Sequence, residues 1–221
     1  MKPGLFPGLH YRRVDRGPLR SAAEELEYEI FSACGYAGPG PKIREYETCP
    51  SVFYVAVSED EGVVGIVRKV TPGPSCLPTL KGFELDASNQ TLVDALARPS
   101  LCEDIATTVI RKGFRARKNF ACVLNLWRLA FQDAVASGAR HWFAAAEPLV
   151  LHHYKNTFHF AFEELGPPQD YLGAACLPCV LDLAKAVEHL SAMDSELASW
   201  LCEGLDSRCP MPVRVTSART S

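Results

Sequence analysis

Five cationic side chains lie within the eight residues 111–118, which read Arg-Lys-Gly-Phe-Arg-Ala-Arg-Lys. Asn119 follows them and can cap a helix, because apolar residues recur at helical spacing from Phe120 to Ala134. A helix N-terminus offers free backbone N–H groups and a positive dipole end, to which these cations add charge. The segment predicts an anion site, with an exposed basic turn as the alternative. Its candidate phosphate-binding residues are Arg111, Arg115, Arg117, Lys118 and Asn119.

Two carboxylates stand beside predicted strands. Asp104 opens the apolar, β-branched segment 104–110, and Glu147 follows the strand predicted at 141–146. A carboxylate close to a substrate amine can accept its proton, so both side chains are candidate catalytic bases. Asp104 has the alternative role of a turn or helix-capping residue, and Glu147 that of a cap for a helix beginning at Pro148.

Three further polar residues are candidates for binding a small substrate. Arg68 lies near the end of the apolar strand 63–70, and its planar guanidinium suits a carboxylate ligand. An ordinary surface ion pair is the other interpretation of Arg68. Glu47, like Glu45 beside it, lies in a polar connector and either binds an amine or is simply solvated.

The sequence predicts no metal site. Cys176 and Cys179 have CxxC spacing, but there is no second such pair, and packing in a strand explains them better. His152 and His153 are adjacent, so they diverge on a helix and make a poor metal pair. Nucleophile-elbow, Walker and dinucleotide-binding motifs are absent from the sequence.

The elements that must position these residues follow one another as helix, hairpin, strand, long helix, strand, helix and two strands. This order predicts an α+β architecture with a mixed sheet flanked by helices, in a single domain over 1–205 with a polar tail at 206–221. The first helix should carry Glu24, Glu25, Glu27 and Glu29 mostly on its exposed side. The expected ranges are 19–34, 52–57, 63–70, 104–110, 119–138, 141–146, 148–154, 158–165, 172–181 and a long C-terminal helix over 183–201.

Composition limits the class of protein. The 221 residues are 48% hydrophobic and 22% charged with a net charge of −3, so nucleic acid is not an expected partner. No signal peptide and no membrane-spanning segment is expected, and the nine scattered cysteines favour reduced thiols in the cytoplasm.

Several short motifs resemble those of the GNAT acyltransferases. The similarity is greatest to the branch with acyl-homoserine-lactone synthases and long-chain N-acyl amino acid synthases, and it covers roughly residues 19–185. It implies a mixed, mostly antiparallel GNAT-like sheet. The motifs are Glu29-Ile30-Phe31, the Val-Val-Gly-x-x-Arg strand at 63–68, the strand 104–109 with Phe114-Arg115 after it, and Leu165-Gly166-Pro167-Pro168.

The resemblance implies an N-acyltransferase that moves a fatty acyl group from a thioester carrier to a small amine. Asp104 and Glu147 would assist proton removal, Arg68 would bind an acceptor carboxylate, and backbone N–H groups of a splayed strand pair would stabilise the oxyanion. Trp142 and Phe143 would line an acyl channel, with core packing as the alternative.

Two departures from the family pattern bear on the substrates. Lys118 and Phe120 stand where the coenzyme A loop usually has small residues, which favours acyl carrier protein over acyl-CoA as donor. Thr107 stands where homoserine-lactone synthases have Arg, which favours an amino acid or similar amine over S-adenosylmethionine. A lactone-forming synthase and a non-catalytic sensor of acyl carriers remain the alternatives, and no tightly bound cofactor is expected.

Overall fold

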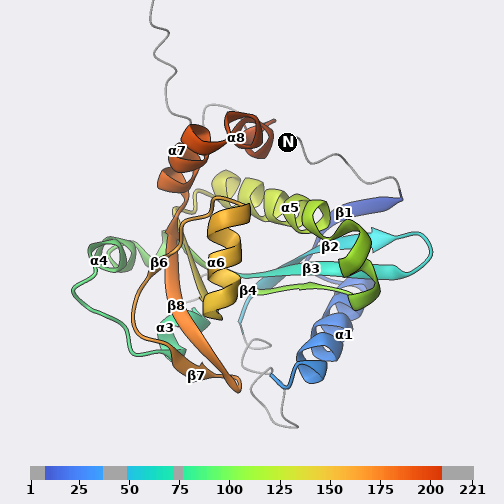
Figure 1. The fold of residues 1–221 in the computed structure, drawn as a ribbon, viewed down its shortest axis with the longest axis horizontal. Coiled ribbons are helices and arrows are strands. Elements are labelled where there is room, and N and C mark those ends of the chain that lie inside the picture. The colour runs from blue at the N-terminus through green and yellow to red at the C-terminus, as the bar shows by residue number, and fades with distance from the viewer. Residues whose placement is uncertain (1–7, 37–48, 72–76, 206–221) are drawn as a thin grey trace, which may run out of the picture.

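The computed structural model describes residues 8–36, 49–71 and 77–205, without the side chains of residues 113 and 115–120 (Figure 1). Its strands are β1 (Leu9–Val14), β2 (Ser51–Ser58), β3 (Gly62–Val70), β4 (Cys102–Ile110), β5 (His141–Ala146), β6 (Glu163–Glu164), β7 (Gln169–Tyr171) and β8 (Ala174–Asp182). Its helices are α1 (Pro18–Ala33), α3 (Pro78–Gly82), α4 (Gln90–Leu96), α5 (Lys112–Ser137), α6 (Pro148–Thr157), α7 (Leu183–Met193) and α8 (Ser195–Cys202).

The strands form one sheet in the order β1-β2-β3-β4-β5-β8-β6, with β7 paired to β8. All neighbours run antiparallel except β4 and β5, which are parallel. The predicted α+β fold with a mixed, mostly antiparallel sheet is therefore confirmed. In Figure 1, α5 lies across one side of the sheet and α1 across the other.

Each face of the sheet has its own apolar core. On the α5 face, the largest cluster joins Trp127 and Phe131 of α5 to Trp142 of β5 and to α7 and α8. On the opposite face, α1 covers Phe53 and Ile66, while α3 and α4 cover Phe143. These three clusters hold β3, β4 and β5 between helices on both sides, which fixes the strands that carry the candidate site.

Three sequence-based boundaries were wrong. Helix α5 begins at Lys112 instead of Asn119, since Lys, Arg and Ala in 112–118 are good helix formers. The strand expected at 158–165 is reduced to Glu163–Glu164, after His159 at a φ of 56°. The long C-terminal helix is two helices, because Asp194 ends α7 and its carboxylate accepts a hydrogen bond from the Leu197 N–H to cap α8.

No helix within the described ranges combines the length and the apolar character needed to cross a bilayer.

Candidate active site

Strands β4 and β5 pair only at their beginnings. Cys102, Glu103 and Asp104 lie opposite His141, Trp142 and Phe143. Beyond these positions β4 continues to Ile110 and β5 to Ala146, with no further pairing between the two strands in the described part of the chain. The edge of β4 that faces β5 therefore carries backbone N–H and C=O groups with no strand partner, next to an opening gap.

A β-bulge lies where the two strands separate. Arg68 of β3 pairs with Thr107 and the next residue, Lys69, pairs with Ile105, so Ala106 is an extra residue in β4. A bulge reverses the alternation of side chains beyond it. Ile105 therefore packs in the core on the α5 face, whereas Thr107 points to the α1 face and contacts Glu27.

The gap holds a cleft of about 400 Å³. Residues of β4 and β5 form its two sides, and Trp127 of α5 and Tyr154 of α6 also line it. Burial raises the pKa of Tyr154 to about 12, so its phenol stays protonated at neutral pH. The remaining lining residues are mostly apolar: Ile30, Phe31, Cys34, Tyr36, Ile105, Ala106, Thr107, Thr108, Val109, Ala144, Ala145, Ala146, Glu147, Val150, Tyr171, Leu172 and Cys176.

Glu147 places a carboxylate in this cleft. It occupies the N-cap position of α6, as the capping alternative expected, but its side chain makes no capping hydrogen bond. The Tyr36 hydroxyl instead donates a hydrogen bond to Glu147 Oε1. Burial and then the neighbouring carboxylate raise the pKa of Tyr36, while burial and Glu147 raise that of Cys176 to about 11.

Arg68 lies in a buried network beside the cleft. Its Nη1 is 2.9 Å from Glu27 Oε2, and its Nε donates to Ser51 Oγ at 3.3 Å. Thr107 Oγ1 donates to the other carboxylate oxygen of Glu27. Arg68 and Glu27 are 2% and 3% exposed, so the sequence-based expectation of an exposed Glu27 was wrong, as was the surface ion pair considered for Arg68.

Asp104 is not among the residues that line the cleft. It is 1% exposed and accepts a hydrogen bond from the Thr79 N–H at 2.8 Å, in the first turn of α3. Burial raises its pKa to about 7, although the hydrogen bonds from Thr79 act in the opposite direction. The helix-capping alternative describes the position of Asp104 in this structure.

Trp142 and Phe143 also lie away from the cleft, because both belong to the paired end of β5. Trp142 packs edge-on against Trp127 and Phe131, and its Nε1 donates to Glu103 at 3.0 Å. Phe143 is fully buried under α3 and α4. Of the two alternatives, core packing is the one that their positions match.

The predicted anion site is described in part. Arg111 is the N-cap of α5, and its Nη1 lies 3.3 Å from Glu29 of α1. Arg115, Arg117, Lys118 and Asn119 lie in the first turns of α5, and their side chains are outside the described residues, as is Glu47. The backbone nevertheless begins a long helix at the open end of β4, where N–H groups are available to an anion.

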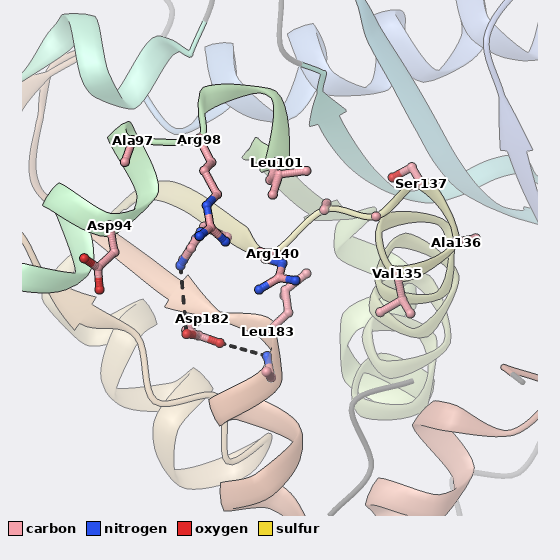
Figure 2. Close-up of a pocket in the computed structure, with 14 residues that line it drawn as sticks. Asp94, Ala97, Arg98, Leu101, Val135, Ala136, Ser137, Arg140, Asp182 and Leu183 are labelled. Carbon is pink, nitrogen blue, oxygen red and sulfur yellow. Dashed lines mark hydrogen bonds and ion pairs between the residues drawn. The ribbon is translucent and has the colours of Figure 1, made fainter. Parts of the chain in front are cut away.

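A larger depression of about 790 Å³ lies at the opposite end of β5 (Figure 2). Figure 2 shows two arginines, Arg98 and Arg140, and two aspartates, Asp94 and Asp182, around it. Asp182 already accepts hydrogen bonds from the first N–H groups of α7 and lies 3.9 Å from His141.

The described residues contain no cluster of three or more His, Cys, Asp or Glu side chains placed to bind a metal ion. Cys176 and Cys179 are both buried in β8. Burial raises the pKa of both thiols, so they remain protonated.

Solved structures confirm the GNAT fold that the sequence motifs indicated. FeeM, an N-acyl amino acid synthase from uncultured soil microbes, superposes with a TM-score of 0.61 at 14% identity over 82% of this chain and 94% of FeeM. The AHL synthase LasI gives 0.56 at 12% identity over 85% and 94%. A Lactobacillus plantarum protein assigned as an N-acetyltransferase gives 0.54 at 14% identity over 80% and 99%.

No family model matches the sequence, and no curated protein matches it either. At the identities found, the structural similarity establishes the fold. The functional argument therefore depends on the cleft itself.

Three residues used in the site, Tyr36, Tyr154 and Glu27, were not identified as site residues from the sequence. Tyr36 carries no sequence signal beyond its position after α1. Glu27 does carry one, since it lies on the same helical face as Ala23 and Ile30, which are both buried.

Proposed function

We propose that the protein is an N-acyltransferase that moves an acyl group from a thioester to the amine of a small acceptor. The observation that carries this proposal is the parting of β4 and β5 after Asp104 and Phe143, with Glu147 in the resulting cleft. A thioester arm requires such a gap between strands, and the unpaired N–H groups of β4 can bind it.

The reaction needs a proton acceptor, a stabilised oxyanion and a proton donor. Glu147 lines the cleft and Asp104 does not, so Glu147 takes the proton of the substrate ammonium group. The amine nitrogen then attacks the thioester carbonyl carbon, and β4 N–H groups stabilise the oxyanion. The C–N bond forms as the C–S bond breaks, and the departing sulfur takes up the second amine proton to leave as a thiol. The protonated phenol of Tyr154 lies in the cleft and can relay this proton.

The donor in this proposal is an acyl group on acyl carrier protein, with acyl-CoA as the alternative. The first turns of α5 begin at the open end of β4 and carry Arg111, Arg115, Arg117 and Lys118 in sequence. These cations suit both a single phosphopantetheine phosphate and the acidic surface of a carrier protein. The proposed site of the reaction is the cytoplasm, where acyl carrier proteins receive their acyl groups.

The test follows thiol release and acyl-amine product from acyl carrier protein and from acyl-CoA, each with a pool of amines and amino acids. Glu147→Gln should lower the transfer rate by about 10²–10⁴-fold, because it removes the base while keeping the size of the side chain. Asp182→Asn, in the other depression, is the matched control and should transfer at the wild-type rate. Amine-independent thiol release, or an unchanged rate in Glu147→Gln, would contradict the proposal.

The same assay separates the alternatives. A lactone-forming synthase would release methylthioadenosine from S-adenosylmethionine. A non-catalytic sensor would bind the charged carrier without releasing thiol, with or without Glu147.

A further inference from the structure

The described side chains that line the cleft suit a cation better than a carboxylate. Among the described residues that line it, Glu147 is the one with a formal charge, and that charge is negative. The Tyr36 hydroxyl holds one of its oxygens in place. An ammonium group entering the cleft is attracted to this carboxylate, whereas a second carboxylate on the same substrate is repelled.

The guanidinium that would otherwise offset this repulsion is already engaged by the protein. Arg68 pairs with Glu27 at 2.9 Å, donates to Ser51 at 3.3 Å, and stacks on the ring of Phe53 with its centre 5.2 Å from the ring centroid. The pair is buried, so the positive charge of Arg68 is neutralised before a substrate arrives.

Thr107 connects this buried pair to the cleft. Its hydroxyl donates its proton to Glu27 and lines the cleft as well, so towards a substrate it acts as a hydrogen-bond acceptor. Thr107 and Glu147 therefore both favour a donor-rich group such as an ammonium.

We propose that the acceptor is a primary amine without a carboxylate beside the amino group, and that Glu27 is a positioning residue that sets this selectivity. The inference rests on the transferase function proposed above and names its acceptor class. Glu27 acts through its neighbours: it occupies Arg68 and orients the hydroxyl of Thr107.

The experiment compares matched acceptors with wild-type protein. Each amino acid is paired with its decarboxylated amine and its methyl ester, for example tyrosine, tyramine and tyrosine methyl ester. We expect kcat/KM for the amine and the ester to exceed that for the free amino acid by about tenfold or more. Equal or faster acylation of the free amino acid would overturn the inference. Failure to acylate any acceptor would instead count against the transferase function itself.

Glu27→Gln tests the positioning role. The amide keeps the shape of the side chain but removes the negative charge 2.9 Å from Arg68, so the ratio of kcat/KM for amino acid to that for amine should rise about tenfold, chiefly through a lower KM for the amino acid. Glu24→Gln, on the exposed side of the same helix, should leave the ratio unchanged. An unchanged ratio in folded Glu27→Gln protein would refute the role of Glu27.

A second variant covers the case in which Glu27→Gln does not fold. The double change Glu27→Gln, Arg68→Met removes both buried charges and replaces the guanidinium by an apolar chain of similar length. Because Arg68 does not contact the acceptor in this proposal, the double variant should keep the wild-type preference for amines. A selective further loss of amino acid acylation would show that Arg68 binds the carboxylate and would overturn the inference.

Discussion

The paired end and the open end of strands β4 and β5 differ in their backbone pairing and in the partners of their charged side chains. At the paired end, Lys69 donates to Glu103 and Asp133 at 2.8 Å each, and Trp142 donates to Glu103. Every member of this group has a protein partner. At the open end, the strands part and Glu147 has one hydroxyl partner and an apolar cleft in front of it.

The larger of the two cavities does not lie at the open end of the strands, where the candidate site is. The depression beyond the paired end, at about 790 Å³, is larger than the cleft, at about 400 Å³. Its aspartate Asp182 nevertheless serves the N-terminus of α7, and its arginines are exposed to solvent. The mostly apolar cleft, in which the Glu147 carboxylate has a single hydroxyl partner, is better suited to catalysis than the larger depression, whose charged groups are hydrated or already paired.

The largest effect is expected from breaking the paired end. Lys69→Met removes the cation shared by Glu103, which is buried, and Asp133, which is partly exposed, and leaves the Glu103 carboxylate without a cationic partner among the described residues. We expect a loss of about 3–5 kcal/mol in the free energy of unfolding, measured by urea denaturation. Arg13→Met removes the half-exposed partner of Asp133 and should cost less than about 1 kcal/mol. Equal losses in the two variants would contradict the distinction.

The next effect comes from filling each hollow in turn. Ala145→Phe places a ring in the cleft and should lower kcat/KM about 100-fold, which corresponds to about 2.7 kcal/mol. Ala136→Phe places the same ring in the larger depression and should leave transfer unchanged. Melting temperatures measured alongside separate blocked binding from unfolding. Wild-type activity in Ala145→Phe would show that the substrate does not use the cleft.

A pH effect is expected from Asp104, at the last paired position. Its pKa is raised from 3.8 to about 7, so between these values the folded state holds a proton that the unfolded state has released. The contribution of Asp104 to the free energy of unfolding is therefore fully present below about pH 4 and declines as the pH rises to 7. We expect the free energy of unfolding, measured with urea at pH 4, 5.5 and 7, to fall between pH 4 and pH 7 by on the order of 1–3 kcal/mol less in Asp104→Asn than in the wild-type protein. Identical slopes would contradict the shift.

The smallest effect is expected at the rim of the larger depression. Asp182→Ala removes the acceptor of the Ala184 and Lys185 N–H groups and should cost about 0.5–2 kcal/mol in thermal or urea unfolding. Acyl transfer at the permissive temperature should not change. Asp182→Asn should restore most of the stability, since Asn caps helices about as well as Asp. Loss of transfer in folded Asp182→Ala protein would assign this hollow a part in the reaction.

The sequence was informative wherever a residue's surroundings are local. The hairpin of β2 and β3, the strand–helix–strand unit of β4, α5 and β5, and the GNAT fold all follow from alternation, helical spacing and short motifs. The position of Glu147 after a strand also follows, because a strand end marks where its side chain leaves the sheet.

The parts that sequence reasoning misplaced depend on register and on burial between distant elements. The length over which β4 and β5 stay paired determines whether Asp104 lines a cleft or a sealed ladder, and no local pattern encodes it. Arg68 looked suited to a substrate because its partner, Glu27, is 41 residues away on another element. A single Glu on the apolar stripe of α1 was the available signal.

The extra residue at Ala106 gives β4 two alternations in place of one. Before it, the odd-numbered Glu103 and Ile105 belong to the α5 side; after it, Thr107 and Val109 belong to the α1 side. An alignment that places a gap elsewhere in this strand would exchange inward and outward positions in half of it and pair the wrong residues between relatives. The same count makes deletion of Ala106 a more damaging lesion than deletion of any residue in the β2–β3 turn, which would only shorten a loop.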